Sequence, residues 1–182
     1  MNDSTEVLSD GELVRRGRRG DERALTDLVK RHHAAVYRTA LAILSNPEDA
    51  KDVAQGAFLK AFRGLDGFRG DAAFRTWLLT ITANEARGVL RRRSRRAETT
   101  LEKTGPVASG NPGPDEAAVR ADEVRRARSL LDRLPEKQKM AVRLRIDEGL
   151  SFKEIGAVIG SSEGAARVNY FHGINRLREW MT

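Results

Sequence analysis

The stretch that decides the fold spans residues 68–96 and reads FRGDAAFRTWLLTITANEARGVLRRRSRR. It opens with a short loop, residues 68–72, and five arginines close it within residues 91–96. Because aromatic rings stack on unpaired bases and arginines neutralise phosphates, we predict a helix that contacts DNA where its strands part. The alternative is an amphipathic core helix with a solvated basic end. The apolar residues with the i, i+3, i+4, i+7 spacing of one helical face are Phe74, Trp77, Leu78 and Ile81.

Three polar residues of the same stretch fall on the other side of the predicted helix. They are Asn84, Arg87 and Arg91, and their spacing of three and four residues keeps them on one face. This face is suited to lying along duplex DNA, with the arginine cluster as a further contact to phosphates.

The composition favours a polyanionic partner. The chain has 182 residues with 33 Lys+Arg against 26 Asp+Glu, a formal charge of +7. It has no cysteine, which rules out disulfides and thiolate metal sites. The acidic, polar start does not resemble a signal peptide, and no apolar run approaches the roughly 18 residues that a membrane span needs. We therefore expect a cytoplasmic protein that does not insert directly into a membrane.

Signals of catalysis are close to absent. None of the histidines, His32, His33 and His172, lies in an HExxH arrangement, and there is no GxxxxGK[ST] loop and no GxSxG. We expect no enzyme, no catalytic residue, no metal site, no cofactor and no small-molecule substrate.

A helix is predicted to begin at Asn46 and Pro47, a capping residue followed by the proline that suits the first helical position. Its apolar face is wide, and a set of residues lies mostly off that face. We call this set the docking strip, because exposed acidic and amide groups on a basic protein can bind a basic partner protein. Ordinary solvation explains the strip equally well. Its members are Asp49, Asp52, Gln55 and Leu59.

Residues 97–116 differ from everything around them. Three of the five prolines lie here and helical periodicity is lost, which indicates a flexible linker. We therefore predict an all-α protein of two small helical modules, residues 10–96 and 117–182.

The second module has the proportions of a helix-turn-helix. A helix is predicted from Glu136 to Glu148, and a capping box at Ser151 and Glu154 opens the next one. A tight turn at residues 160–162 then leads into a longer helix.

The last helix divides into an inner and an outer face. Ala166, Tyr170, Gly173, Ile174 and Leu177 have the spacing of core residues. The outer residues can contact base edges, thymine methyl groups or phosphates, and Arg176 suits a phosphate. The alternative is a simple helical hairpin packed on the first module. We call the outer residues the reading face: Arg167, Val168, Phe171 and His172.

Both modules resemble one family, the bacterial RNA polymerase sigma factors of the extracytoplasmic-function (ECF) group. Residues 46–96, with NPEDAKDVAQGAFLKAF and FRGDAAFRTWL, are similar to the family's second conserved region. Residues 134–179, with LPEKQKMAVRLR and GLSFKEIGAVIG, are similar to its fourth. The two motifs stand in the family's order with a linker between them, which makes the resemblance specific.

The resemblance implies a promoter-specificity subunit that binds core RNA polymerase, recognises and melts promoter DNA, and directs initiation for a restricted regulon. The loop at residues 68–72 would accept a base flipped from the non-template strand. The helix-turn-helix would recognise the minus-thirty-five element through the reading face and Arg176, and the docking strip would bind the polymerase clamp helices. The residues implied for the minus-ten element and the adjoining duplex are Phe68, Arg69, Gly70, Asp71, Ala72, Phe74, Trp77, Asn84, Arg87, Arg91 and Arg92.

Two places depart from the family's pattern. Gly56 stands where an acidic residue usually follows Gln55, which removes one charge from the docking strip. Val168 and Asn169 follow Arg167 where the family usually has a serine and a basic residue, so we expect a less cationic and more apolar readout.

The partners implied are core RNA polymerase and promoter DNA, double-stranded and melted. The family also makes an anti-sigma factor a partner to consider, although no residue here indicates one. The competing interpretation is a stand-alone helix-turn-helix transcription regulator, which would have no need of the docking strip or the loop.

Overall fold

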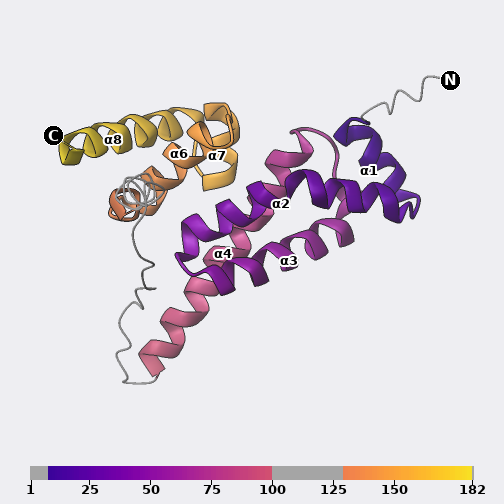
Figure 1. The fold of residues 1–182 in the computed structure, drawn as a ribbon, viewed down its shortest axis with the longest axis horizontal. Helices are drawn as coiled ribbons and strands as arrows, with labels where there is room; N and C mark the ends of the chain where they lie inside the picture. The colour runs from indigo at the N-terminus through magenta and orange to yellow at the C-terminus, as the bar shows by residue number, and fades with distance from the viewer. Residues whose placement is uncertain (1–7, 100–128, 182) are drawn as a thin grey trace, which may run out of the picture.

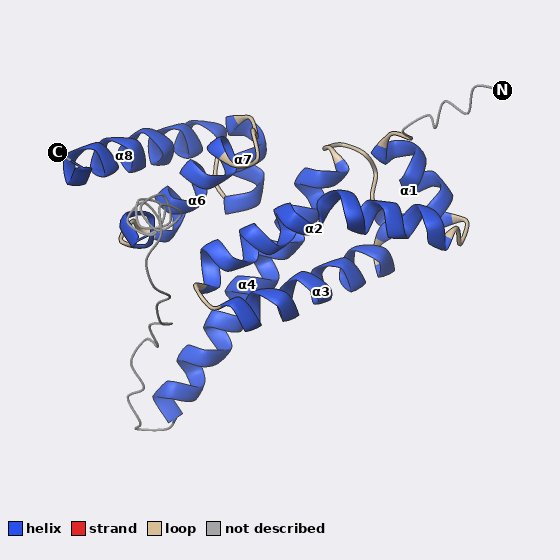
Figure 2. Cartoon of the chain, in the orientation of Figure 1, coloured by secondary structure: helices blue, strands red, loops and turns tan. Residues whose placement is uncertain are grey.

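The structure is a computed structural model, and it describes residues 8–99 and 129–181. Within these residues every regular element is a helix (Figure 2), which confirms the predicted all-α fold. The elements are α1 (Asp10–Arg18), α2 (Glu22–Leu44), α3 (Pro47–Arg63), the short 3-10 helix η1 (Leu65–Gly67), α4 (Phe74–Thr99), α6 (Glu136–Ile146), α7 (Phe152–Ile159) and α8 (Glu163–Met181).

The first module is built around α2, which packs against α1, α3 and α4 (Figure 1). Side chains as large as Leu28 and Leu78 are fully buried between these helices. Asn46 caps α3 as predicted, accepting a hydrogen bond from the Asp49 backbone N–H at 3.1 Å. At Ser9 only half of a capping box forms, because the Glu12 carboxylate pairs with Arg15 and Arg16 instead.

The second module is a compact arrangement of α6, α7 and α8. Ser151 and Glu154 form the predicted capping box at the start of α7. The turn after α7 passes so close to that helix that a Cβ atom on Gly156 would lie 2.8 Å from the Ser161 carbonyl oxygen. Gly160 ends α7 in the left-handed region, at φ 66°, where glycine is free of strain.

The two modules touch along one seam, where α7 packs against α4 and α6 packs against α2 (Figure 1). Buried apolar residues of both modules belong to one continuous cluster. The predicted linker, residues 97–116, and the start of the second module, residues 117–128, lie outside the described residues, except that α4 continues through Thr99.

Candidate nucleic-acid interface

The loop at residues 68–72 stands on an aromatic platform, which we define as Phe68, Phe74 and Trp77. The Phe68 ring centroid lies 5.0 Å from that of Trp77 and 5.8 Å from that of Phe74. Phe74 is buried, whereas Phe68 and Trp77 are half-buried. The three rings therefore pack together at the start of the loop, and Phe74 does not reach the surface.

The remaining loop residues, Arg69, Gly70, Asp71 and Ala72, are all exposed. Gly70 has a φ of 80°, in the left-handed region that glycine adopts without steric cost. The loop thus has an exposed tip, and its first residue, Phe68, packs against the rings of Phe74 and Trp77.

Arg18 of α1 fixes the base of this loop, a role that sequence reasoning missed. Its Nε donates to the Leu65 carbonyl oxygen at 3.0 Å, and its guanidinium also donates to the Phe68 carbonyl oxygen. In the sequence, Arg18 is one of several arginines at a helix end, so nothing distinguishes it from a solvated cation.

A buried histidine, His32, contacts the Phe74 ring of the aromatic platform. The His32 ring is 5.7 Å from that of Phe74, and its Nε2 contacts an Asp10 carboxylate oxygen at 2.8 Å. Arg31 donates to the other oxygen of the same carboxylate at 2.6 Å. Burial lowers the pKa of His32, and Asp10 opposes this effect without cancelling it. His32 therefore packs in the core and links α1 to α2 through Asp10.

The face of α4 predicted to follow duplex DNA is only partly free. Asn84, Arg91 and Arg92 are exposed. Arg87 has a side chain only 20% exposed, because its Nε donates to a Glu136 carboxylate oxygen at 2.9 Å and its Nη1 to the Val158 carbonyl oxygen at 3.4 Å. In this structure Arg87 therefore contacts the second module.

The reading face on α8 has the exposure that helical periodicity predicted. Arg167, Val168, Phe171 and His172 are all exposed, and Phe171 retains 52% of its surface. The Arg167 guanidinium lies 5.2 Å from the ring centre of Phe152, which holds it at the surface of the helix. Arg176 is also exposed, and it donates to Gln138 at 3.1 Å.

The docking strip borders a groove that the sequence did not reveal. Gln55 and Leu59 line an open cavity of about 320 Å³ between α2 and α3, and Leu59 is 51% exposed. Asp52 is exposed, whereas Asp49 forms an ion pair with Arg93 of α4. We call this cavity the α2–α3 groove, and its other lining residues are Val29, His33, Lys51, Phe58 and Phe62.

Residues 8–99 and 129–181 contain neither a metal centre nor a membrane-spanning helix. No group of three or more histidine, aspartate or glutamate residues there is arranged to hold a metal ion. None of the helices described combines the length and the apolar character needed to cross a bilayer.

Two families match the chain. The Sigma-70 region 2 family matches residues 28–96, and the Sigma-70 region 4 family matches residues 130–179. Among solved structures, CnrH in complex with the cytosolic domain of CnrY has a TM-score of 0.71 and 27% identity, covering 94% of this chain and 96% of that chain. RpoE in complex with the anti-sigma factor NepR from Bartonella quintana has a TM-score of 0.69, and at 21% identity this likeness concerns the fold.

Curated relatives extend the match over most of the chain. The RNA polymerase sigma-H factor of Pseudomonas aeruginosa is 36% identical over 170 residues, covering 89% of this chain and 88% of the relative. The ECF RNA polymerase sigma-E factor of Escherichia coli K12 is 35% identical over 178 residues, covering 92% and 91%. With both sigma regions matched in order on an all-α fold, the chain belongs to the ECF group of RNA polymerase sigma factors.

Proposed function

We propose that this chain is a promoter-specificity subunit that binds core RNA polymerase, recognises and melts promoter DNA, and directs initiation at a restricted set of promoters. Membership of the ECF group supports this role. We assign polymerase docking and the minus-ten element to residues 10–96, the linker to residues 97–116, and the minus-thirty-five element to residues 117–182.

Strand separation is assigned to the loop at residues 68–72. Its exposed tip can surround a flipped base, and half-buried Phe68 and Trp77 offer ring edges against which the base can pack. Flipping costs a few kcal/mol of stacking, which contacts in the loop must offset. Arg18 lowers the cost of ordering the loop, because it already fixes the backbone at Leu65 and Phe68.

Duplex recognition is assigned to α8 and to the far end of α4. The reading face presents one cation, His172 and two apolar side chains, so contacts to thymine methyl groups carry more of the readout than in a strongly basic helix. Arg91 and Arg92 are exposed and serve as phosphate contacts that position the duplex without specifying its sequence.

Polymerase docking is assigned to the α2–α3 groove together with the docking strip. The groove is apolar at its base, where Val29, Phe58 and Phe62 lie, and polar at its rim. Such a surface fits a helical partner that inserts apolar side chains and pairs its cations with Asp52. The clamp helices of the polymerase are the proposed occupant.

An anti-sigma factor is a further proposed partner. CnrH, to which this chain is similar in fold over both modules, was solved with the cytosolic domain of CnrY, and RpoE of Bartonella quintana, which shares the fold, was solved with the anti-sigma factor NepR. A partner of this class would compete with polymerase or DNA for the surfaces assigned above.

The observation that carries the proposed function is the exposed loop on its aromatic platform, because a regulator that only binds duplex DNA has no use for it. Permanganate oxidation of unpaired thymines tests it. Core polymerase with this protein should make thymines near the minus-ten element reactive, and neither component alone should. Sequence-specific duplex binding without core polymerase, and no reactive thymines with it, would instead support a stand-alone regulator.

A further inference from the structure

We propose that the free chain adopts a closed state in which carboxylates of the second module occupy cations of the first module that otherwise bind the DNA phosphate backbone. This inference rests on the proposed DNA-binding role of the first module. It concerns the seam between α2 and α4 on one side and α6 and α7 on the other.

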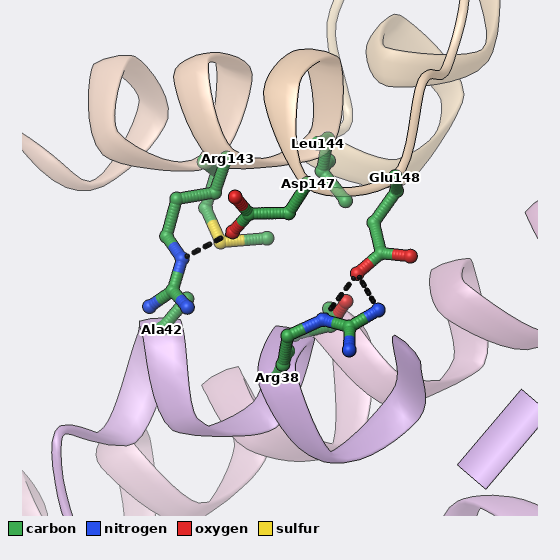
Figure 3. Close-up of a pocket in the computed structure, with 8 residues that line it drawn as sticks. Arg38, Ala42, Arg143, Leu144, Asp147 and Glu148 are labelled. Carbon is green, nitrogen blue, oxygen red and sulfur yellow. Dashed lines mark hydrogen bonds and ion pairs between the residues drawn. The ribbon is translucent and has the colours of Figure 1, made fainter. Parts of the chain in front are cut away.

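Glu148 is the centre of the seam. Its side chain is only 2% exposed, and two arginines of the first module hold it. Arg38 of α2 donates from Nε to a Glu148 carboxylate oxygen at 2.8 Å, and its Nη2 lies 2.7 Å from the same oxygen as an ion pair. Figure 3 draws both contacts. Arg75 of α4 donates to the other carboxylate oxygen, and its Nη1 donates to the Glu148 backbone oxygen at 2.9 Å.

Two further contacts extend the seam along α4. Thr76 and Arg87 lie three turns apart on one face of this helix. Thr76 donates to a Glu154 carboxylate oxygen at 2.8 Å, and Arg87 pairs with Glu136 at 2.9 Å. Glu136 and Glu148 thus pair with Arg38, Arg75 and Arg87 across a single interface, and Glu154 adds a hydrogen bond from Thr76.

The three arginines have the chemistry of a phosphate site. A guanidinium binds a carboxylate and a phosphate through the same planar arrangement of N–H donors. Arg87 belongs to a set of polar residues on α4, and it is covered while the other members are exposed. Those members are Asn84, Arg91 and Arg92. Opening the seam would expose Arg87 beside these residues. The carboxylates of the second module therefore compete with DNA phosphates for the same arginines.

The seam is less complete than a protein core, which fits an interface that opens. The Thr39 hydroxyl and Arg87 Nη2 are buried without a hydrogen-bond partner among the described residues. Thr39 lines a cavity of about 10 Å³ between α2 and α6, which has room for roughly a single water molecule. The apolar cluster nevertheless continues across the seam, so the closed state is stable until DNA or another partner competes.

The test measures opening and DNA binding on the same protein. The natural chain has no cysteine, so Asp66→Cys and Lys153→Cys place one spin label on each module. For the free chain, pulsed electron paramagnetic resonance should give one population with a short distance between the two labels. A nonspecific DNA duplex should reduce that population. The double variant Glu136→Gln, Glu148→Gln should have less of the short-distance population even without DNA.

The same double variant should bind the duplex more tightly. If it raises the open fraction from about a tenth to nearly one, the apparent Kd falls about tenfold. Glu22→Gln with Glu48→Gln changes the net charge equally but lies away from the seam, and it should give a much smaller effect. Glu136→Gln alone, at a half-exposed position, keeps the test valid if loss of buried Glu148 impairs folding.

Two results would overturn the inference. One is a short distance between the two labels that persists when the chain is bound to DNA. In that case the carboxylates would still cover the seam arginines while the chain holds DNA. The other is an opened double variant with no more affinity than the charge control. Either result leaves the proposed sigma activity untouched, since promoter melting is measured separately with permanganate.

Discussion

At the scale of single residues, Arg167 is the side chain most suited to distinguishing bases. It is exposed on α8, and its only described ion pair is a 3.3 Å contact with Glu163 one turn away. We expect Arg167→Ala to cost about 1–3 kcal/mol at one position of the upstream element and to relax specificity there. Transcription from promoters varied base by base measures this.

Arg176→Ala is the comparison, because a phosphate contact should weaken all promoters alike. An Arg167→Ala loss that is equal on every sequence would mean that Arg167 contacts only the backbone.

His32 predicts a pH dependence of stability. Burial lowers its pKa in the folded chain below the ordinary value of 6.5, so the unfolded chain takes up a proton first as the pH falls. The stabilising contribution is therefore complete above pH 6.5 and is lost as the pH falls from there toward the pKa of the folded state.

Removing the imidazole should flatten this dependence. The free energy of unfolding of His32→Gln, from urea titrations between about pH 7.5 and about pH 5.5, should change less than that of the parent chain. His33→Gln removes an exposed imidazole from the same helix and is the matched control. A parent and a His32→Gln chain with the same pH slope would contradict the assignment.

Which single residues are exposed could be predicted where helical periodicity alone decides. The reading face illustrates this, because one helix and one packed side determine all four positions. Arg87 illustrates the limit. Helical periodicity places it on the outer face of α4, but Glu136 and the Val158 carbonyl, far away in the sequence, cover it.

At the scale of elements, the α2–α3 groove carries the docking prediction. Leu59→Ala should weaken binding to core polymerase by about 1–2 kcal/mol, and Asp52→Ala should also lower the affinity. Binding of a fluorescently labelled chain to core polymerase measures both. Asp27→Ala removes an exposed carboxylate of α2 outside the groove and should leave the affinity unchanged. Unchanged affinity for both groove variants would place the interface elsewhere.

Two glycines within helices give opposite predictions. A Cβ atom on Gly56 would meet nothing within 4 Å, so Gly56→Ala should stabilise α3 by up to about 1 kcal/mol. That corresponds to a rise in Tm of about 2–4 °C for a chain of this length.

Gly156→Ala should destabilise the second module, because the Ser161 carbonyl oxygen and the Ser162 backbone stand in the way of the new Cβ. Calorimetry of both variants compares them directly. A stabilised Gly156→Ala chain would show that the turn after α7 can move aside without cost.

Helix ends were largely predictable, because their signals are local. Asn46 before Pro47, and Ser151 three residues before Glu154, cap helices as predicted. The groove was not predictable, because Phe58 and Phe62 have the spacing of core residues and only the packing of α3 on α2 leaves a cavity beside them.

At the scale of the whole molecule, the all-α class and the helix-turn-helix followed from helical periods and turn residues. The seam did not, since no periodicity couples Glu148 to Arg38, 110 residues away. An acidic residue before Gly149 has the sequence signature of an ordinary helix end. Contacts of this kind depend on how two folded modules meet.

We propose that this chain gives core polymerase its choice of promoters. Run-off transcription of fragmented genomic DNA by core polymerase, with start sites mapped at single-base resolution, tests it most directly. Adding the protein should create a limited set of new start sites that share two upstream sequence elements. An unchanged profile of start sites, together with no binding to core polymerase, would contradict it.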